Sequence, residues 1–390
     1  MKNTNLHFSL FHITTVLFIV CIGTTSLQAQ GPASGYGEKL LFRGLSGVTF
    51  GGITQTWTIK DSGTVQQYSA PVSVSLPVSN RVLLSLSSAA ATAKFDTANI
   101  QGVTDTRLSL SYVFPGDKLW LVAGVSFPTG HSKLSANEIA VTTLLSQTAF
   151  GYKVPVFGQG LNGNLGLTYA MPITRRFIAG FGINYFYKGK YEPVSIPFTT
   201  ISYAPGGEVS GNIGFDYITL SKKFRFSADL NGTYFFQDKL NNTVIFQSGV
   251  RFIGFFAATI RTESFLHSLQ MRSRFRGENS YFTNGLEKKF PSVLQFELQY
   301  GAQKTLSSWL TGTLNAEIKN YSEDQIPVGA AIITTGKALV YGAGIDMLFT
   351  FSNFILPAVS VKYNQGTVTL ENTPLTVTGF EAGINLKMAF

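Results

Sequence analysis

Three arginines, Arg272, Arg274 and Arg276, stand two positions apart, so in an extended strand their guanidinium groups project from one face. Guanidinium groups in such a row can bind carboxylates or phosphates through charge-assisted hydrogen bonds. In a strand that crosses a membrane, a charge facing lipid at mid-depth costs about 2–4 kcal/mol. The arginine ladder is therefore expected on the polar side of its strand.

The same alternation assigns further charged side chains to polar strand faces, with seven cations against four acids. The cations are Arg107, Arg225, Arg272, Arg274, Arg276, Lys319 and Lys387, and the acids are Asp229, Glu297, Glu317 and Glu381. Three interpretations stay open. The charges could pair across strands and fill the interior. They could line a passage that attracts anionic head groups. The ladder could also lie at an outer rim and bind lipopolysaccharide phosphates.

Few residues outside these strands could perform catalysis. Two histidines, His131 and His267, follow the N-terminal segment, and a catalytic His needs a Ser or carboxylate partner on the barrel wall. His131 lies in a loop, and His267 shares parity with apolar residues, which places it on the lipid-facing or rim side and away from the lumen acids. Residues 158–163 (GQGLNG) match the pattern G-x-G-x-x-G but open a strand, whereas a dinucleotide site needs a helix there. We expect no enzyme activity, no cofactor and no bound metal. The net charge of +9 comes without an aromatic-rich basic patch, which argues against nucleic acid.

The composition favours one large closed sheet. Only 13% of the 390 residues are charged, 44% are hydrophobic, 13% are aromatic and 39 are glycine. A disordered chain would not carry so much apolar and aromatic mass. Beyond the N-terminal segment the longest apolar run is 252–260, too short for a membrane-spanning helix of roughly 20 residues. The remaining class is all-β.

Apolar and polar residues alternate over segments longer than the strands of soluble proteins. In 224–234, for example, phenylalanine, alanine and leucine alternate with arginine, serine and asparagine. A soluble sandwich could show the same alternation, but segments of roughly ten or more residues suit tilted membrane strands. Aromatic residues cluster at segment ends, as at 185–187 and 234–236, where an interfacial girdle would lie. The pattern predicts a transmembrane antiparallel up-and-down β-barrel over residues 47–390.

Sixteen segments alternate in this way, and we expect an even number of strands between 14 and 16. The segments are 48–59, 67–79, 81–94, 105–114, 118–128, 161–172, 175–191, 206–221, 224–237, 243–258, 264–278, 293–305, 308–321, 338–351, 354–369 and 375–390. Short connections alternate mostly with long ones at 95–104, 129–160, 192–205, 279–292 and 322–337. In outer-membrane barrels the short turns face the periplasm, so both termini are expected there.

The long connection 129–160 contains a helix signal. Ser135 and Glu138 form an S-x-x-E capping box, and apolar residues follow. We expect a short helix that either lies across the barrel mouth as a lid or rests on the rim.

The chain begins with an expected signal peptide over residues 1–29, in which Lys2 precedes an apolar stretch at 13–22. The one cysteine, Cys21, lies within it, so disulfides and thiol chemistry are excluded from the mature chain. Residues 30–46 are either a periplasmic lead or a plug in the lumen. The terminal Phe390 resembles the C-terminal signal that the outer-membrane barrel assembly machinery reads. That machinery, outer-membrane lipid and lipopolysaccharide are the expected partners.

Residues 71–77 (PVSVSLP) and 121–130 (LVAGVSFPTG), which end at Pro128-Thr129-Gly130 before a long loop, carry a family resemblance. They resemble the FadL-like fatty-acid transporters and the outer-membrane barrels of aromatic-degradation pathways. The resemblance implies a small apolar ligand but transfers no binding residue. The expected function is an outer-membrane channel for passive uptake of small hydrophobic or amphipathic molecules. The alternative is a structural or assembly barrel that anchors a partner protein.

Overall fold

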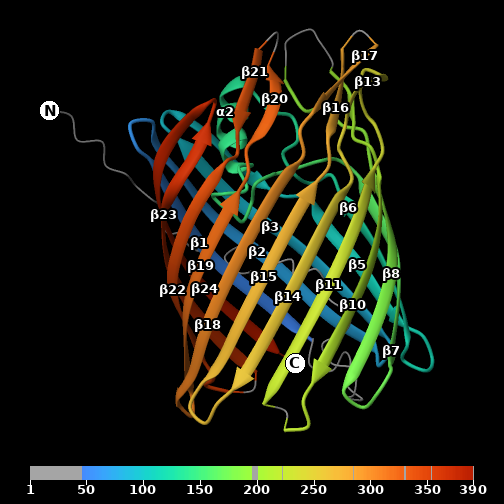
Figure 1. Ribbon diagram of the computed structural model, residues 1–390, viewed down its shortest axis with the longest axis vertical. Coiled ribbons are helices and arrows are strands. Elements are labelled where there is room, and N and C mark those ends of the chain that lie inside the picture. The colour runs from blue at the N-terminus through green and yellow to red at the C-terminus, as the bar shows by residue number, and fades with distance from the viewer. Residues whose placement is uncertain are drawn as a thin grey trace, which may run out of the picture.

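The computed structural model describes residues 46–195, 201–221, 223–283, 285–328, 331–352 and 354–389. Sixteen antiparallel strands form one barrel, and it closes where the last strand pairs with the first from Gly47↔Ala389 to Ile59↔Val377 (Figure 1). The barrel strands are β1 (Gly47–Ile59), β2 (Gly63–Ser79), β3 (Val82–Phe95), β5 (Thr106–Val113), β6 (Leu119–Phe127), β7 (Asn162–Pro172), β8 (Phe177–Lys188), β10 (Glu208–Ile218), β11 (Phe224–Phe235), β14 (Arg251–Arg261), β15 (Leu266–Arg276), β18 (Val293–Ser307), β19 (Leu310–Tyr321), β22 (Ala338–Phe349), β23 (Ile355–Leu370) and β24 (Thr373–Ala389). The predicted barrel with its even strand number is confirmed.

Closure follows from the medium that the strands face. An open sheet edge would leave unpaired backbone groups in hydrocarbon, and pairing β24 with β1 removes that edge. Large apolar side chains remain exposed on the outer face, among them Phe181, Leu314 and Ile384 at 59–62%. A soluble protein would bury such a band. The chain is therefore a transmembrane barrel of the bacterial outer membrane.

The two ends of the barrel differ (Figure 1). At the end that we call the turn end, neighbouring strands are joined by short connections such as 79–82 and 114–118, and the first and last barrel strands reach it. At the loop end lie all five predicted long connections and a sixth at 236–250. These carry β4 (Ala98–Val103), β9 (Tyr203–Ala204), β12 (Asp238–Leu240), β13 (Thr243–Gln247), β16 (Asn279–Thr283), β17 (Leu286–Phe290), β20 (Asp324–Val328), β21 (Ala331–Thr335) and the helix α2 (Ala136–Leu145).

One predicted strand was wrong. The sequence suggested a single strand at 243–258, but the structure splits it into β13, which joins a small outer sheet, and β14 in the barrel wall. The break lies at Gly249, where a Cβ would come within 2.4 Å of the Gly277 backbone. This close approach lets the chain leave the outer sheet and enter the barrel. The next turn, at 262–265, is closed by Thr262, whose hydroxyl accepts a hydrogen bond from the Phe265 N–H at 3.1 Å.

The predicted helix is α2. The Ser135 N–H donates to Glu138 Oε2 at 2.8 Å, as a capping box requires. Val141 and Leu145 on its inner side are buried and join the main apolar cluster of the barrel with Trp57 and Ile100. The helix therefore packs against the wall at the loop end, next to β3 and β4. Among the described residues, no helix is both long and apolar enough to cross a membrane.

Candidate functional site

The chain that follows α2 enters the barrel and runs along its inner wall. Two glutamines that face each other across β1 and β2 hold its backbone. Gln55 Nε2 donates to the Gly151 carbonyl at 3.0 Å, and Gln55 Oε1 accepts from the Lys153 N–H at 2.8 Å. Gln67 Nε2 donates to the Val154 carbonyl at 2.7 Å, and Gln67 Oε1 accepts from the Val154 N–H at 3.0 Å. We call residues 147–160 the inserted segment.

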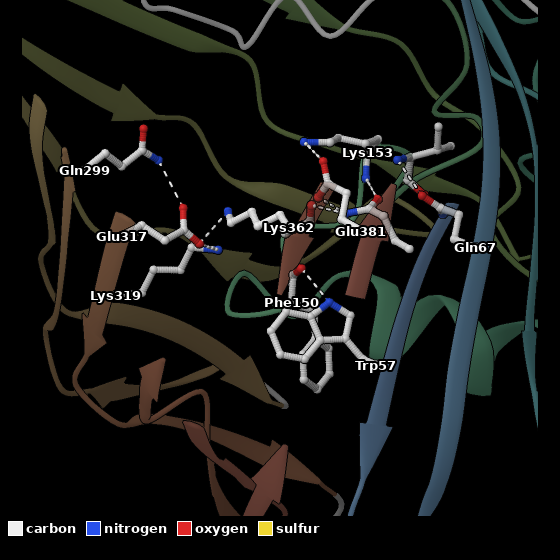
Figure 2. Close-up of polar contacts among 12 residues, drawn as sticks. Trp57, Gln67, Phe150, Lys153, Gln299, Glu317, Lys319, Lys362 and Glu381 are labelled. Atoms are coloured by element: carbon white, nitrogen blue, oxygen red, sulfur yellow. Dashed lines mark hydrogen bonds and ion pairs between the residues drawn. The ribbon is translucent and has the colours of Figure 1, made fainter. Parts of the chain in front are cut away.

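Aromatic contacts fix the inserted segment further. The buried Trp57 indole donates to the Phe150 carbonyl at 2.9 Å, and the two rings lie 5.1 Å apart (Figure 2). The Tyr152 hydroxyl donates to the Val65 carbonyl at 3.0 Å, and burial raises the pKa of this phenol, so it stays protonated. Burial of these rings and pairing of every named donor make the segment a fixed part of the bore.

The neck of this loop explains the Pro-Thr-Gly motif. The Asp105 carboxylate accepts hydrogen bonds from the Gly130 N–H at 2.9 Å and from the Gln159 N–H at 2.7 Å. It therefore ties the two ends of the loop to one point of the wall. A Cβ on Gly130 would lie 2.1 Å from the Phe157 carbonyl oxygen, and one on Gly158 would lie 2.8 Å from Gly130. Glycine is required at both positions by close approach, and the G-x-G-x-x-G run forms part of this neck.

Beneath the inserted segment lies a polar pocket of about 390 Å³ on the inner faces of β15, β18, β19, β22, β23 and β24. Lys153 of the segment reaches Glu381 at its upper edge with 3.1 Å between Nζ and Oε1, and Gln55 donates to the other oxygen at 3.0 Å (Figure 2). Deeper in the wall, Glu317 accepts from Lys362 at 2.5 Å and Lys319 at 3.3 Å. Both of these carboxylates therefore have a cationic partner, as charges removed from water require.

On β6, β7, β8 and β10, the inner face of the wall carries glycines and asparagines. Each of three asparagines stands opposite a glycine of the neighbouring strand, and the pairs are Gly124–Asn164, Gly166–Asn184 and Gly182–Asn212. A Cβ on these glycines would come within 2.4, 2.9 and 2.6 Å of the amide oxygen. The asparagine side chains therefore lie along the wall, over the glycines of the neighbouring strands. We call this surface of β6–β10 the glycine–asparagine wall.

The arginine ladder lies on the inner face of β15, across the bore from the inserted segment. Arg276 Nη2 is 2.7 Å from Asp324 Oδ1 of the outer hairpin, and Arg272 is 3.9 Å from Glu297. Arg274 donates to the neutral Gln295 oxygen at 2.9 Å. The ladder begins at Arg276, at the loop end of β15, and runs along the strand toward the middle of the barrel.

Of the remaining predicted residues, Arg107 contacts the glycine–asparagine wall and the others lie elsewhere. Arg225 forms a paired contact with Asp216 at 2.9 and 2.7 Å near the turn end. Arg107 donates to Asn164 at 3.1 Å, Asp229 stands opposite Gly214, and Lys387 lies near the last described residues. Phe390 and the segments 1–29 and 30–45 lie outside the described residues, so those expectations stay predictions.

The prediction omitted several charges of the inner face: Lys153, Lys188, Glu208, Asp216, Arg251, Asp346 and Lys362. Alternation with Ser360 and Asn364 could have identified Lys362. Lys188, Glu208 and Arg251 stand at strand ends, where alternation gives little signal. Nothing in the sequence pattern marks Lys153 as part of the bore.

The two histidines occupy separate places. His131 Nε2 lies 3.2 Å from Glu138 Oε1 in the loop that carries α2. Burial opposes ionisation of Glu138, but hydrogen bonds from Ser135 and the charge of His131 together lower its pKa below the ordinary value. His267 Nδ1 lies 2.7 Å from the Tyr300 hydroxyl on the outer face, next to an apolar groove. Within the described ranges, no three His, Cys, Asp or Glu side chains are placed to hold a metal ion.

Comparison with known proteins finds a likeness in fold alone. No protein family and no curated sequence matches the chain. Similar solved structures include the TodX monoaromatic hydrocarbon channel deltaS2 mutant, with a TM-score of 0.45 and 10% identity over 88% of this chain and 91% of that one. The anion-selective porin from Comamonas acidovorans has a TM-score of 0.42 and 11% identity, covering 87% and 99%. The CymD monoaromatic hydrocarbon channel has a TM-score of 0.39 and 12% identity, covering 88% and 89%.

Proposed function

We propose that this chain is a passive outer-membrane channel that admits small amphipathic molecules through the part of the bore left open by the inserted segment. The arrangement of that segment carries the proposal. Gln55, Gln67 and Trp57 hold it against one side of the barrel. A structural barrel could be filled from side to side, whereas here the far side carries glycines and flat-lying amides.

The lining supports amphipathic cargo rather than purely apolar cargo. The pocket below the inserted segment presents carboxylates, amides and lysines, which would hold water. Nearer the turn end, Leu83, Val113 and Trp120 form a small apolar cluster. A molecule with a polar head and a short apolar body would meet the polar pocket and, nearer the turn end, the partly buried Trp120 that covers Leu83 and Val113. Diffusion down a gradient needs no nucleotide energy, so none is required by the proposal.

Flux through reconstituted protein tests the channel. We expect proteoliposomes of the wild type to swell in isosmotic solutions of small solutes and to show steps of ionic current in planar bilayers. Asn184→Trp places an indole on the glycine–asparagine wall, at a position that already carries a side chain, and should lower both the swelling rate and the conductance.

The adjacent residue provides the matched control. Ile183 is 60% exposed on the outer face, so Ile183→Trp should leave both rates close to those of the wild type. Folded wild-type protein that passes neither solute nor ions would refute the channel and favour the anchoring barrel. Equal effects of the two tryptophans would place the route elsewhere than along β8.

A further inference from the structure

The inner wall at β14 and β15 combines clustered positive charge with an apolar strip. Arg251 of β14 stands directly opposite Arg276 of β15, and Arg274 and Arg272 continue below it on the same face. Like charges placed opposite one another in a sheet are destabilising. Nothing in the packing of a barrel wall requires four arginines at this place.

Carboxylates neutralise this cluster only in part. Glu208 forms ion pairs with both Lys188 and Arg251, and Glu208 Oε2 lies 3.6 Å from Arg251 Nη2. Counting Glu297 and Asp324 with Glu208, three carboxylates face five cations, the four arginines and Lys188. Arg274 has no carboxylate partner among the described residues and donates only to a neutral amide. Among these eight groups the cations therefore exceed the carboxylates by two, while Asp229 stands opposite Phe255 on β11 and Lys319 stands opposite Glu297 on β19.

The charged row has apolar residues at its side. Ile253 and Phe255 follow Arg251 on the inner face of β14, opposite Arg274 and Arg272 respectively. An apolar side chain on the inner face of a water-filled barrel gains little unless something apolar covers it. The side chain of Arg272 is 38% exposed, so the row is reachable from the bore.

The ladder also lies on the part of the wall that faces the inserted segment across the bore. In a ring of sixteen strands, β2 and β14 are eight strands apart and face each other across the bore. The inserted segment is bound to β1 and β2, so the strands directly across the bore from it are β11 and β14, and β15 stands next to β14.

We infer that this wall, formed by Arg251, Arg272, Arg274, Ile253 and Phe255, is a binding site for small amphipathic anions with one carboxylate and a compact apolar body. The guanidinium groups bind the carboxylate, and Ile253 with Phe255 covers the body. The inference deepens the proposed function by naming a substrate class, and it rests on that function for the transport step.

Current block by benzoate tests this site. Benzoate, added to wild-type channels conducting KCl, should reduce the current at a lower concentration than acetate, and neutral benzyl alcohol should not reduce it. Arg274→Gln should raise the half-blocking benzoate concentration roughly ten- to hundredfold, the effect of losing one charge-assisted hydrogen bond. Phe255→Ala should weaken the block by benzoate and leave that by acetate unchanged.

Two controls separate local binding from general charge. Lys304→Gln removes one positive charge from the outer face, where Lys304 lies over the Phe265 ring, and should not change the block. Arg274→Lys keeps the charge and should retain most of the anion selectivity measured by reversal potential. Equal block by benzoate and acetate, or equal effects of Arg274→Gln and Lys304→Gln, would overturn the inference.

Other outcomes are also decisive. Stronger block by inorganic phosphate than by benzoate, with benzoate displaced by added lipopolysaccharide, would assign the ladder to lipid phosphates instead and overturn the inference. If the wild type passes no current, the proposed function fails. Calorimetric titration of the folded protein in detergent with benzoate then tests the binding site independently of transport. The wild type should bind benzoate more tightly than Arg274→Gln and Phe255→Ala, and equal affinities would overturn the inference.

Discussion

Two neighbouring residues of the closing strand should lose very different amounts of stability on the same substitution. Ile384 points outward, is 62% exposed, and stands opposite Gly52 and Val359. Asn385 lines the polar pocket and stands opposite Gly51 and Ala358. Replacing each with arginine therefore places one new charge in lipid and the other in the bore.

The depth of Ile384 sets the magnitude. It is the third of the five outward apolar side chains between positions 380 and 388, which are Phe380, Ala382, Ile384, Leu386 and Met388. A charge near the bilayer midplane costs about 2–4 kcal/mol. That is a large share of the roughly 5–15 kcal/mol by which proteins of ordinary stability stay folded. In the pocket, the arginine of Asn385→Arg faces Glu381 and Asp346, so its effect should stay within about 1 kcal/mol.

Refolding into lipid vesicles over a urea series measures both changes, with heat-modifiable gel mobility as the readout of the folded barrel. Ile384→Arg should lower the free energy of unfolding by about 2–4 kcal/mol and Asn385→Arg by much less. A larger loss for Asn385→Arg would mean that the lipid-facing and bore-facing sides of the last strand are the reverse of those described.

Trp57→Phe removes the indole that donates to the Phe150 carbonyl of the inserted segment, and the loss of this buried hydrogen bond costs about 1–3 kcal/mol. Protease cleavage within 147–160 should therefore become faster. Unchanged cleavage would argue against Trp57 as an anchor of the segment. The lowered pKa of Glu138 means that its contribution to α2 is present above 4.5, its ordinary value, and is lost as the pH falls through the folded-state pKa. Protease sensitivity of the loop should therefore rise at acid pH in the wild type and depend less on pH in Glu138→Gln, and an identical pH profile in both would contradict this. Deletion of Phe390 should reduce insertion in cells far more than refolding in vesicles, because one side chain contributes only about 1.5–3 kcal/mol of burial; equal losses in both assays would contradict an assembly signal.

The barrel was predictable because a wall between lipid and a polar bore imposes period-two alternation on every strand. The arginine ladder followed from the same rule, since Arg272, Arg274 and Arg276 share parity and the structure places them on the inner face with Gln270. The rule fails where the chain leaves the wall. Gly249 ends one sheet and begins another, and a single sequence does not distinguish that glycine from those within strands.

The inserted segment was beyond sequence analysis for a different reason. Its anchors Gln55 and Gln67 are polar residues at inward positions, which a water-filled bore would also accept. Only their pairing with backbone groups about ninety residues away shows that they hold a loop. The sequence left open whether the connection at 129–160 covers the barrel mouth or rests on the rim. The structure shows that α2 packs on the wall and that the segment after it enters the bore.

We propose that solutes pass along the glycine–asparagine wall, and chemical modification during a single-channel recording can detect such a route. Cys21 is the one cysteine of the chain and lies in the expected signal peptide, so an introduced cysteine would be labelled alone. With Asn212→Cys, a bulky thiol reagent should lower the conductance in steps. With Ile213→Cys, which is 60% exposed on the outer face, the current should stay constant. Complete labelling of Asn212→Cys without any change in current would contradict the account.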